Sequence, residues 1–93
     1  MEVNMVRIFV RHSVRDYSAW KRTYNAFNKE RRSMGVRGHA VFRAVNNPKD
    51  VTIWHDFTTL TKARKFVNSR RLRQVMKAAG VRSVPKIWFV KAA

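Results

Sequence analysis

The stretch FVRHSVRDYSAWKRTYN, residues 9–25, decides the fold, because an alternating apolar segment passes directly into a helical apolar stripe. Alternation over residues 5–14 predicts a strand with one buried face. That face carries Val6, Ile8, Val10, His12 and Val14. Asp16 follows in the position of a helix N-cap, since its carboxylate can accept hydrogen bonds from the free amides of the first turn.

The helix that follows is expected to run from Asp16 to Gly35. Its large apolar residues recur at steps of three, four, three and seven, which is the spacing of one helix face. They are Tyr17, Trp20, Tyr24, Phe27 and Met34. Gly35 suits the left-handed conformation that commonly ends a helix.

Three further segments have the composition of strands, at residues 39–45, 51–57 and 86–90. The connection Asn46–Asp50 between the first two contains asparagine, proline and aspartate, which are typical turn residues. These two strands are therefore expected to form an antiparallel hairpin.

A second helical segment lies before the last strand. Thr58 or Thr59 can cap it, and Ser69 can cap a short further helix that Gly80 ends. The order of elements is β-α-β-β-α-β, which predicts an α+β, ferredoxin-like fold. We expect a single domain over residues 1–93, with an antiparallel four-stranded sheet in the order 4-1-3-2 and both helical segments on one face.

The composition indicates a small basic globular domain. The 93 residues are 45% hydrophobic and include no cysteine, which excludes a disulfide framework and a thiolate metal site. No apolar run approaches the roughly 18 residues that span a bilayer, and no charge-led apolar segment opens the chain, so a cytoplasmic location is expected. The formal charge of +16 would attract polyanions at low salt. Because the cations are spread over every element, a solvated basic surface is the main interpretation.

The uncovered face of the sheet raises the alternative of nucleic-acid binding. By parity, Phe9 and Trp54 share this face, where RNA-recognition domains stack bases on aromatic rings. The third-strand signature of those domains is K/R-G-F/Y-G/A-F-V-x-F/Y, whereas residues 50–57 read DVTIWHDF. Both glycine positions are β-branched here, and only Trp54 and Phe57 match. A basic nucleic-acid-binding module therefore remains the weaker alternative.

Three stretches carry a resemblance to a known group of proteins. They are the opening FVRHSVRDYSAWKRTYN with its D-Y-x-x-W-K motif, the hairpin FRAVNNPKDVTIWHDF, and the closing NSRRLRQVMKAAGV with PKIWFV. Over about residues 5 to 91, the chain resembles the ferredoxin-like dimeric α+β barrel superfamily, which includes antibiotic biosynthesis monooxygenases and many uncharacterised members.

The resemblance implies a homodimer in which two sheets meet by their uncovered faces. Phe9 and Trp54 would then lie at the dimer interface. Arg7 and Arg11 flank Phe9 on the same face, and unpaired buried charge is costly. They therefore need carboxylates, with Asp56 as one candidate, or backbone carbonyls or water.

The resemblance also implies a ligand cavity between the sheet and the helices. By parity, His12 and His55 face this layer as candidate catalytic residues. The expected substrate-binding residues are Tyr17, Trp20, Tyr24, Phe66 and Met76. Aromatic walls with a few polar groups are typical of a pocket for a small planar molecule. The two histidines are offset by about four residues, or roughly 14 Å along the strands, so no metal ion is expected between them.

The implied activities need no cofactor. They are the oxidation, isomerisation or cyclisation of an aromatic or polyketide-like substrate, with His12 or His55 as general base. Some members of the superfamily bind haem, but this sequence contains no assured axial ligand. It also lacks a Gly-rich phosphate loop, G-x-S-x-G, H-E-x-x-H and paired carboxylates.

Other interpretations of the same residues stay open. A non-catalytic structural or regulatory dimer would have the same fold. Each histidine on the buried face can also be explained as a hydrogen-bonded residue of the core or its rim without a catalytic role. The tyrosines and Trp20 can likewise be explained as ordinary core residues. His39, beside Gly38 at the start of a strand, is expected to be exposed to solvent.

Overall fold

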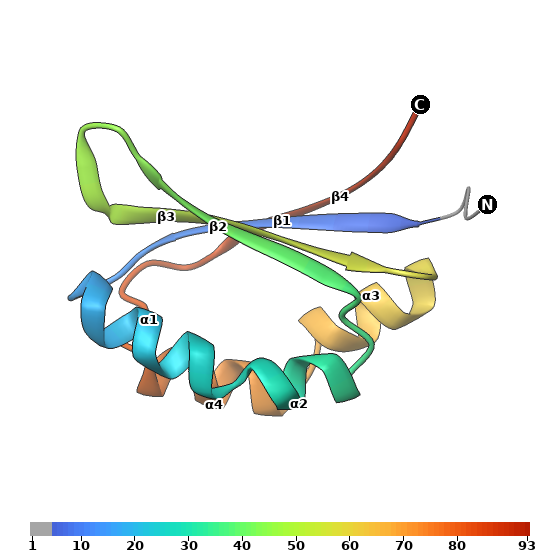
Figure 1. Cartoon of the computed structure of the whole chain (residues 1–93), viewed down its shortest axis with the longest axis horizontal. Coiled ribbons are helices and arrows are strands. Elements are labelled where there is room, and N and C mark those ends of the chain that lie inside the picture. Colours follow the sequence, from blue (N-terminus) through green and yellow to red (C-terminus); the bar gives the residue numbers. More distant parts are fainter. Residues whose placement is uncertain (1–4) are drawn as a thin grey trace.

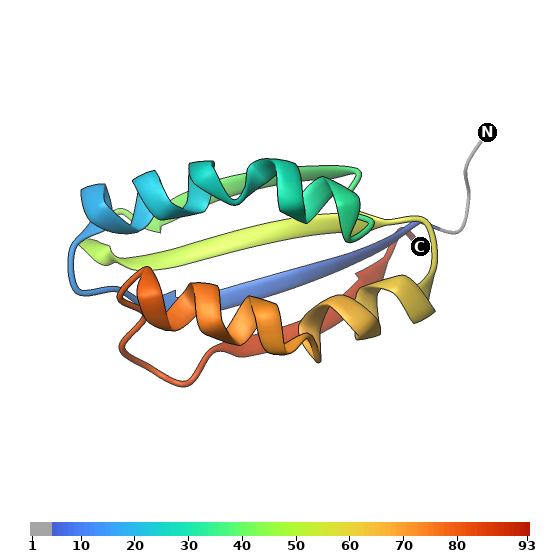
Figure 2. The same cartoon turned by 90° about the horizontal axis from the view of Figure 1, so that it is seen from below.

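A computed structural model describes residues 5–93 and confirms the ferredoxin-like arrangement. Four antiparallel strands form one sheet in the order β2-β3-β1-β4, which is the predicted order read from the other edge. All helices cover the same face (Figure 1). Figure 2 shows that α1 and α2 lie on the side of the sheet edge formed by β2, while α3 and α4 lie on the side of β4. The elements are β1 Val6–Ser13, α1 Tyr17–Ala26, α2 Asn28–Ser33, β2 Gly38–Ala44, β3 Asn47–Phe57, α3 Leu60–Val67, α4 Arg70–Ala78 and β4 Lys86–Lys91.

The core lies between the central strands and the helices. On β1 and over residues 51–57 of β3 every second side chain is buried, as the alternation predicts. The stripe of α1 packs on this surface through Trp20 and Tyr24. The predicted single domain covers residues 1–93. Its first four residues lie outside the described part of the chain.

The expected helix boundaries are largely confirmed. Asp16, Thr59 and Ser69 cap α1, α3 and α4, each accepting a hydrogen bond from the amide three residues further on. Gly35 and Gly80 have φ of +104° and +86°, which L side chains rarely adopt. Among the described residues, no helix has the length and apolar character needed to cross a membrane.

The expected uninterrupted helix from Asp16 to Gly35 is wrong, because the helix breaks at Phe27 between α1 and α2. The guanidinium of Arg31 donates from Nη1 to the backbone carbonyl of Tyr24 at 2.6 Å. In a continuous helix, the amide of Asn28 would donate to that carbonyl. A buried side chain therefore occupies a backbone acceptor where the helix is interrupted.

The hairpin connection also differs from the expected one. The turn consists of residues 45–46, and β3 already begins at Asn47. The register shifts between Arg43 and Ala44. Pairing with β1 keeps the start of β3 extended, because Val14 donates its amide to the carbonyl of Lys49. The predicted turn Asn46–Asp50 is therefore mostly strand.

The uncovered face of the sheet carries one row of aromatic residues. Phe9 pairs with Trp54 on one side and with Trp88 on the other. Phe9 and Trp88 stack with ring centroids 5.4 Å apart. Ala40 pairs with Trp54 and Phe42 with Thr52, so β2 contributes Ala40 and Phe42 to this face.

The two arginines on this face are paired within the chain. Arg7 makes a bidentate ion pair with Asp56, the predicted partner, at 2.7 and 3.0 Å. Arg11 makes a second with Asp50, at 3.0 and 2.7 Å. Both arginines that flank the aromatic rings of the uncovered face are therefore neutralised by carboxylates.

We expect the Ser69→Ala variant to be less stable than the wild type by about 1 kcal/mol, because the first turn of α4 loses its side-chain cap. Ser69→Asn keeps an acceptor and serves as the control. The free energy of unfolding, measured in urea, checks both. Equal stability of the alanine variant and the wild type would contradict the capping role.

Candidate functional site

A cavity of about 50 Å³ lies between the sheet and the helices. Of the seven side chains that were predicted to form the site, six line it: His12, Trp20, Tyr24, His55, Phe66 and Met76. Most of the remaining wall is aliphatic, from β1, β3, β4 and α4. Strand parity and helix periodicity therefore bring the predicted residues of five elements to one place.

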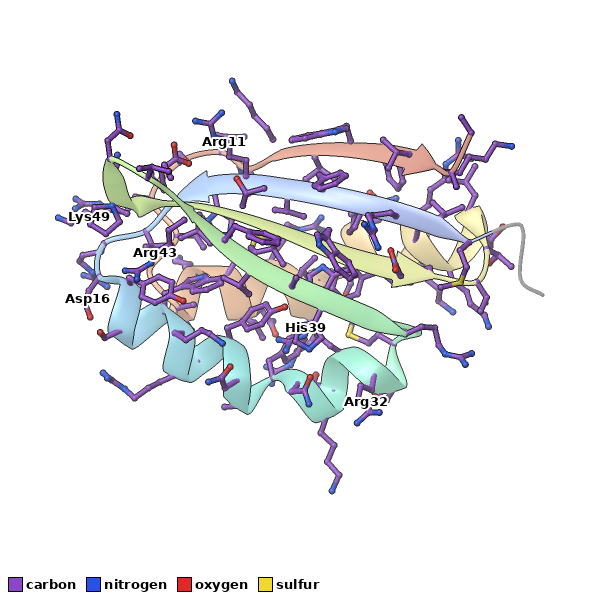
Figure 3. The ribbon with its side chains drawn as sticks, turned by 45° about the horizontal axis from the view of Figure 1, so that its top comes forward. Arg11, Asp16, Arg32, His39, Arg43 and Lys49 are labelled. Atoms are coloured by element: carbon purple, nitrogen blue, oxygen red, sulfur yellow. The ribbon has the colours of Figure 1, made fainter. Side chains whose placement is uncertain are left out.

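Tyr17, the seventh predicted residue, does not line the cavity. It is the first residue of α1, so its half-buried ring lies beyond the end of the cavity. The ring packs on Trp20, with centroids 5.9 Å apart, and beneath the guanidinium of Arg43. Asp16 and Arg43 mark this end of the molecule in Figure 3.

The rings of the site form a continuous series. His12 meets the edge of Trp20, Trp20 stacks on Tyr24 at 4.9 Å, and Tyr24 stacks on His55 at 6.2 Å. His55 meets the edge of Phe66 at 5.2 Å. The register confirms the predicted offset of the two histidines along the strands. Within residues 5–93, no three histidine, cysteine or acidic residues come together to hold a metal ion.

Arg31 also lines the cavity, and sequence reasoning missed it. Its side chain is 1% exposed, and its guanidinium carbon lies 3.6 Å from the centroid of the Tyr24 ring. Nη1 and Nη2 donate to the Tyr24 carbonyl and to Asn28 Oδ1, whereas Nε has no partner among the described residues. A signal was present, because Arg31 fills the gap of seven between Phe27 and Met34 on the apolar stripe.

No carboxylate in the described chain pairs with Arg31. All four described acidic residues have other partners, Asp16 at an N-cap and the rest in ion pairs with arginines: Glu30, Asp50 and Asp56. Burial lowers the pKa of Arg31 from its ordinary value, but arginine remains charged in proteins. The cavity therefore contains a positive charge without a counter-charge.

His12 and His55 are both buried, and burial disfavours the protonated form of each ring. Burial lowers the pKa of His55 to about 3, and the nearby positive charge of Arg31 lowers it further in the same direction. Burial also lowers the pKa of His12. The Nδ1 atom of each ring is buried without a hydrogen-bond partner among the described residues. Each Nδ1 can accept a proton or donate one, depending on the tautomer.

The hydroxyl of Tyr24 lies between two histidines. Its Oη is 2.9 Å from His39 Nδ1 and 3.2 Å from His55 Nε2. Burial raises the pKa of Tyr24 to about 12, so the hydroxyl keeps its proton. His39 is exposed, as predicted, but its bond to Tyr24 was not predicted. His39 and His55 are cross-strand partners, which explains how one hydroxyl reaches both.

Comparison with solved structures finds the same architecture in other proteins. An antibiotic biosynthesis monooxygenase-like protein from Bordetella bronchiseptica matches with a TM-score of 0.82 and 16% identity, over 97% of this chain and 98% of that one. SnoaB, a cofactor-independent oxygenase from Streptomyces nogalater, matches with a TM-score of 0.79 and 12% identity, over 97% and 94%. A conserved protein from Methanosarcina mazei Go1 matches at 0.78 and 10%, over 99% and 96%.

The chain has the antibiotic biosynthesis monooxygenase-like fold. This confirms the resemblance in the sequence at the level of the fold. Neither a protein-family model nor a curated protein matches the chain. Because identity to these three structures is 16% or less, their similarity extends to the backbone only, and the cavity residues are argued from this chain alone.

We expect the protein to lose stability on acidification between about pH 6.5 and 4.5. His55 stays neutral in the folded state, with its pKa lowered to about 3, whereas the unfolded chain protonates it near 6.5. The unfolded state therefore binds more protons in this window, and the free energy of unfolding falls by up to about 1.4 kcal/mol per pH unit from this residue. His12, with its lowered pKa, contributes in the same direction.

Urea unfolding at a series of pH values measures this slope. His55→Gln should flatten it, because the group that titrates on unfolding is gone. His39→Gln, at an exposed position, should leave most of it in place. A wild-type stability that is constant from pH 6.5 to 4.5 would show that His55 is not held neutral by burial.

Proposed function

We propose that the protein binds a small aromatic or polyketide-like molecule in this cavity and removes a proton from it without a cofactor. The reaction would be that of a cofactor-independent monooxygenase, isomerase or cyclase. One observation carries the proposal: the apolar cavity is lined by a buried guanidinium that pairs with no carboxylate of residues 5–93, and by two buried imidazoles whose Nδ1 atoms have no hydrogen-bond partner among those residues. The description of SnoaB as a cofactor-independent oxygenase supports it.

The chemistry follows from the charges of the cavity. A neutral imidazole can take a proton from an acidic C–H or O–H next to an aromatic ring or carbonyl. The enolate or phenolate that forms is negative, and Arg31 provides the positive charge that stabilises it in a water-poor site. His55 is the better-oriented base, because its bond to the Tyr24 hydroxyl fixes the ring. The stacked rings of Trp20 and Tyr24 offer a flat wall for the substrate.

The cavity is too small for an aromatic ligand unless part of its wall moves. About 50 Å³ holds a few water molecules, so an aromatic ligand must displace part of the wall. Val75 and Met76 of α4 are half-buried, and a methionine side chain repacks easily. We infer that the ligand enters by moving this side of the cavity. A porphyrin is far larger than the cavity, so haem does not fit this site as it stands.

We expect the protein to speed the exchange of the acidic methylene hydrogens of anthrone for deuterium in oxygen-free D₂O. NMR measures the rate. His55→Gln should slow the exchange about a hundredfold, since the general base is lost. Arg31→Met should slow it about tenfold or more, because the anion loses its positive partner.

Arg22→Met is the control, since Arg22 is an exposed arginine on the adjoining helix α1. This variant should exchange the probe at the wild-type rate. Circular dichroism confirms that each variant is folded. Wild-type rates in folded His55→Gln and Arg31→Met variants, or no exchange by the wild type, would contradict the proposed function.

We also propose that the protein is a homodimer joined by the uncovered faces of two sheets. Phe9 and Trp54 are half-buried, and Trp88 remains 44% exposed in the single chain. A contiguous aromatic surface on so small a domain favours association. The ion pairs of Arg7 and Arg11 reduce the cost of burying this face, because each charge already has its partner.

We expect Trp88→Glu to weaken dimerisation at least about thirtyfold, because a central aromatic residue is replaced by a charge. Val84→Glu adds the same charge at a position that is 90% exposed and outside the strands, and serves as control. Sedimentation equilibrium measures the dissociation constant. A monomeric wild type, or equal dissociation constants for the wild type and Trp88→Glu, would contradict the interface.

The nucleic-acid alternative finds less support in the same surface. RNA platforms need free aromatic faces and free cations. Phe9 is stacked on Trp88 at an interplanar angle of 17°, and Arg7 and Arg11 are paired with carboxylates. We therefore favour the small-molecule function over nucleic-acid binding.

A further inference from the structure

We propose that Tyr24 and His39 form a proton relay: as His55 in the cavity takes up the substrate proton, the relay passes another proton from His55 to solvent at the edge of the sheet. The inference rests on the proposed function, because it requires that His55 takes a proton from a bound molecule. It adds two residues that do not accept the substrate proton directly.

The geometry provides a connected path. His55 lies on the central strand β3 and is buried, while its cross-strand partner His39 lies on the edge strand β2 and is exposed. The Tyr24 hydroxyl from α1 is within hydrogen-bond distance of both, at 3.2 and 2.9 Å. Figure 3 shows His39 between β2 and the helical layer. A buried ring nitrogen is thus connected to the molecular surface by one hydroxyl.

The environment of His55 explains why a relay is needed. An imidazolium there would be buried beside Arg31, with no carboxylate of the described chain to balance it. A base that cannot hold a second proton must release one as it takes one. The cost of burying the positive charge is avoided if the charge appears instead at the exposed His39.

The proton count fixes the direction of each bond. A hydroxyl has one proton, so Tyr24 donates to one histidine and accepts from the other. In the state that is ready for substrate, His55 has its proton on Nε2 and donates to Tyr24, which donates to His39 Nδ1. The free Nδ1 of His55 then faces the substrate as a base.

Proton transfer shifts three protons along this path. The substrate C–H or O–H bond breaks and its proton joins His55 Nδ1. The Nε2 proton of His55 passes to Tyr24 Oη, and the former hydroxyl proton passes to His39 Nδ1. His55 and Tyr24 end neutral, His39 becomes an imidazolium, and the electron pair of the broken bond stays on the substrate anion. His39 then releases its Nε2 proton to water.

The surroundings of His39 favour this release. Burial lowers the pKa of His39, and the positive charges of Arg31, Lys21 and Arg32 lower it further. No acidic residue is among the groups that shift it. An imidazolium at this position therefore loses its proton to water more easily than an isolated one.

Deuterium exchange of anthrone tests the relay in folded variants. His39→Gln should slow the exchange about tenfold or more, with an unchanged dissociation constant for anthrone, because only the proton acceptor is lost. Added imidazole should restore the rate in His39→Gln, since the position is open to solvent. It should not restore the rate in Tyr24→Phe, in which the buried link is missing. Arg22→Met again serves as control, because Arg22 is exposed and is not among the groups that shift the pKa of His39.

The outcomes separate the two proposals. Exchange by the wild type together with an equal rate in His39→Gln would overturn the relay and leave the proposed function standing. A rate in His39→Gln that imidazole does not restore would also overturn it.

A second measurement needs no substrate. Nitrogen-15 NMR of the histidine rings should find the His55 proton on Nε2 and a hydrogen-bonded, unprotonated Nδ1 on His39 at pH 8. The Tyr24→Phe variant should lose the protection of the His55 Nε2 proton from exchange with water. If the wild type carries the His55 proton on Nδ1, the relay is wrong even where anthrone does not bind.

Discussion

The burial of one positive charge governs the chemistry of the helical side of this domain. The Arg31 guanidinium donates a hydrogen bond to the backbone carbonyl of Tyr24, where the first helix is interrupted, and lies against the Tyr24 ring. The same charge contributes to the lowered pKa of both His55 and His39. Replacing such a group by an apolar side chain is often neutral for stability or favourable. Its presence in an apolar cavity therefore fits a role in binding better than a role in folding.

Much of the fold could be predicted from the sequence because local rules and packing agree. Alternation placed His12 and His55 on the covered face, and the caps and glycines set most helix ends. The failures arose where a particular contact overrides a local pattern. Pairing with β1 and β2 extends residues 47–50, which have turn composition, and a buried arginine binds a backbone carbonyl where a helix with a regular stripe is interrupted.

The candidate site was predictable in part for the same reason. Parity and periodicity assign residues to a face, so six of the seven chosen side chains reach the cavity. They do not show how far along a helix a cavity extends, which is why Tyr17 was included. A charged residue on an apolar stripe is normally counted as surface, so Arg31 was missed. The bonds of the Tyr24 hydroxyl to His39 and His55 depend on three elements meeting, which one sequence does not reveal.

Every described carboxylate acts as a helix cap or as an ion-pair partner, and this affects how strongly copies of the chain repel one another. With the acidic side chains occupied, the excess of cations is left uncompensated on the outside, and each copy carries a formal +16. Two copies that meet through their sheets repel each other over distances of about a Debye length, roughly 8 Å at physiological ionic strength. Counterions would then act as part of the assembly, and added salt would tighten the association between copies while loosening any contact with a polyanion.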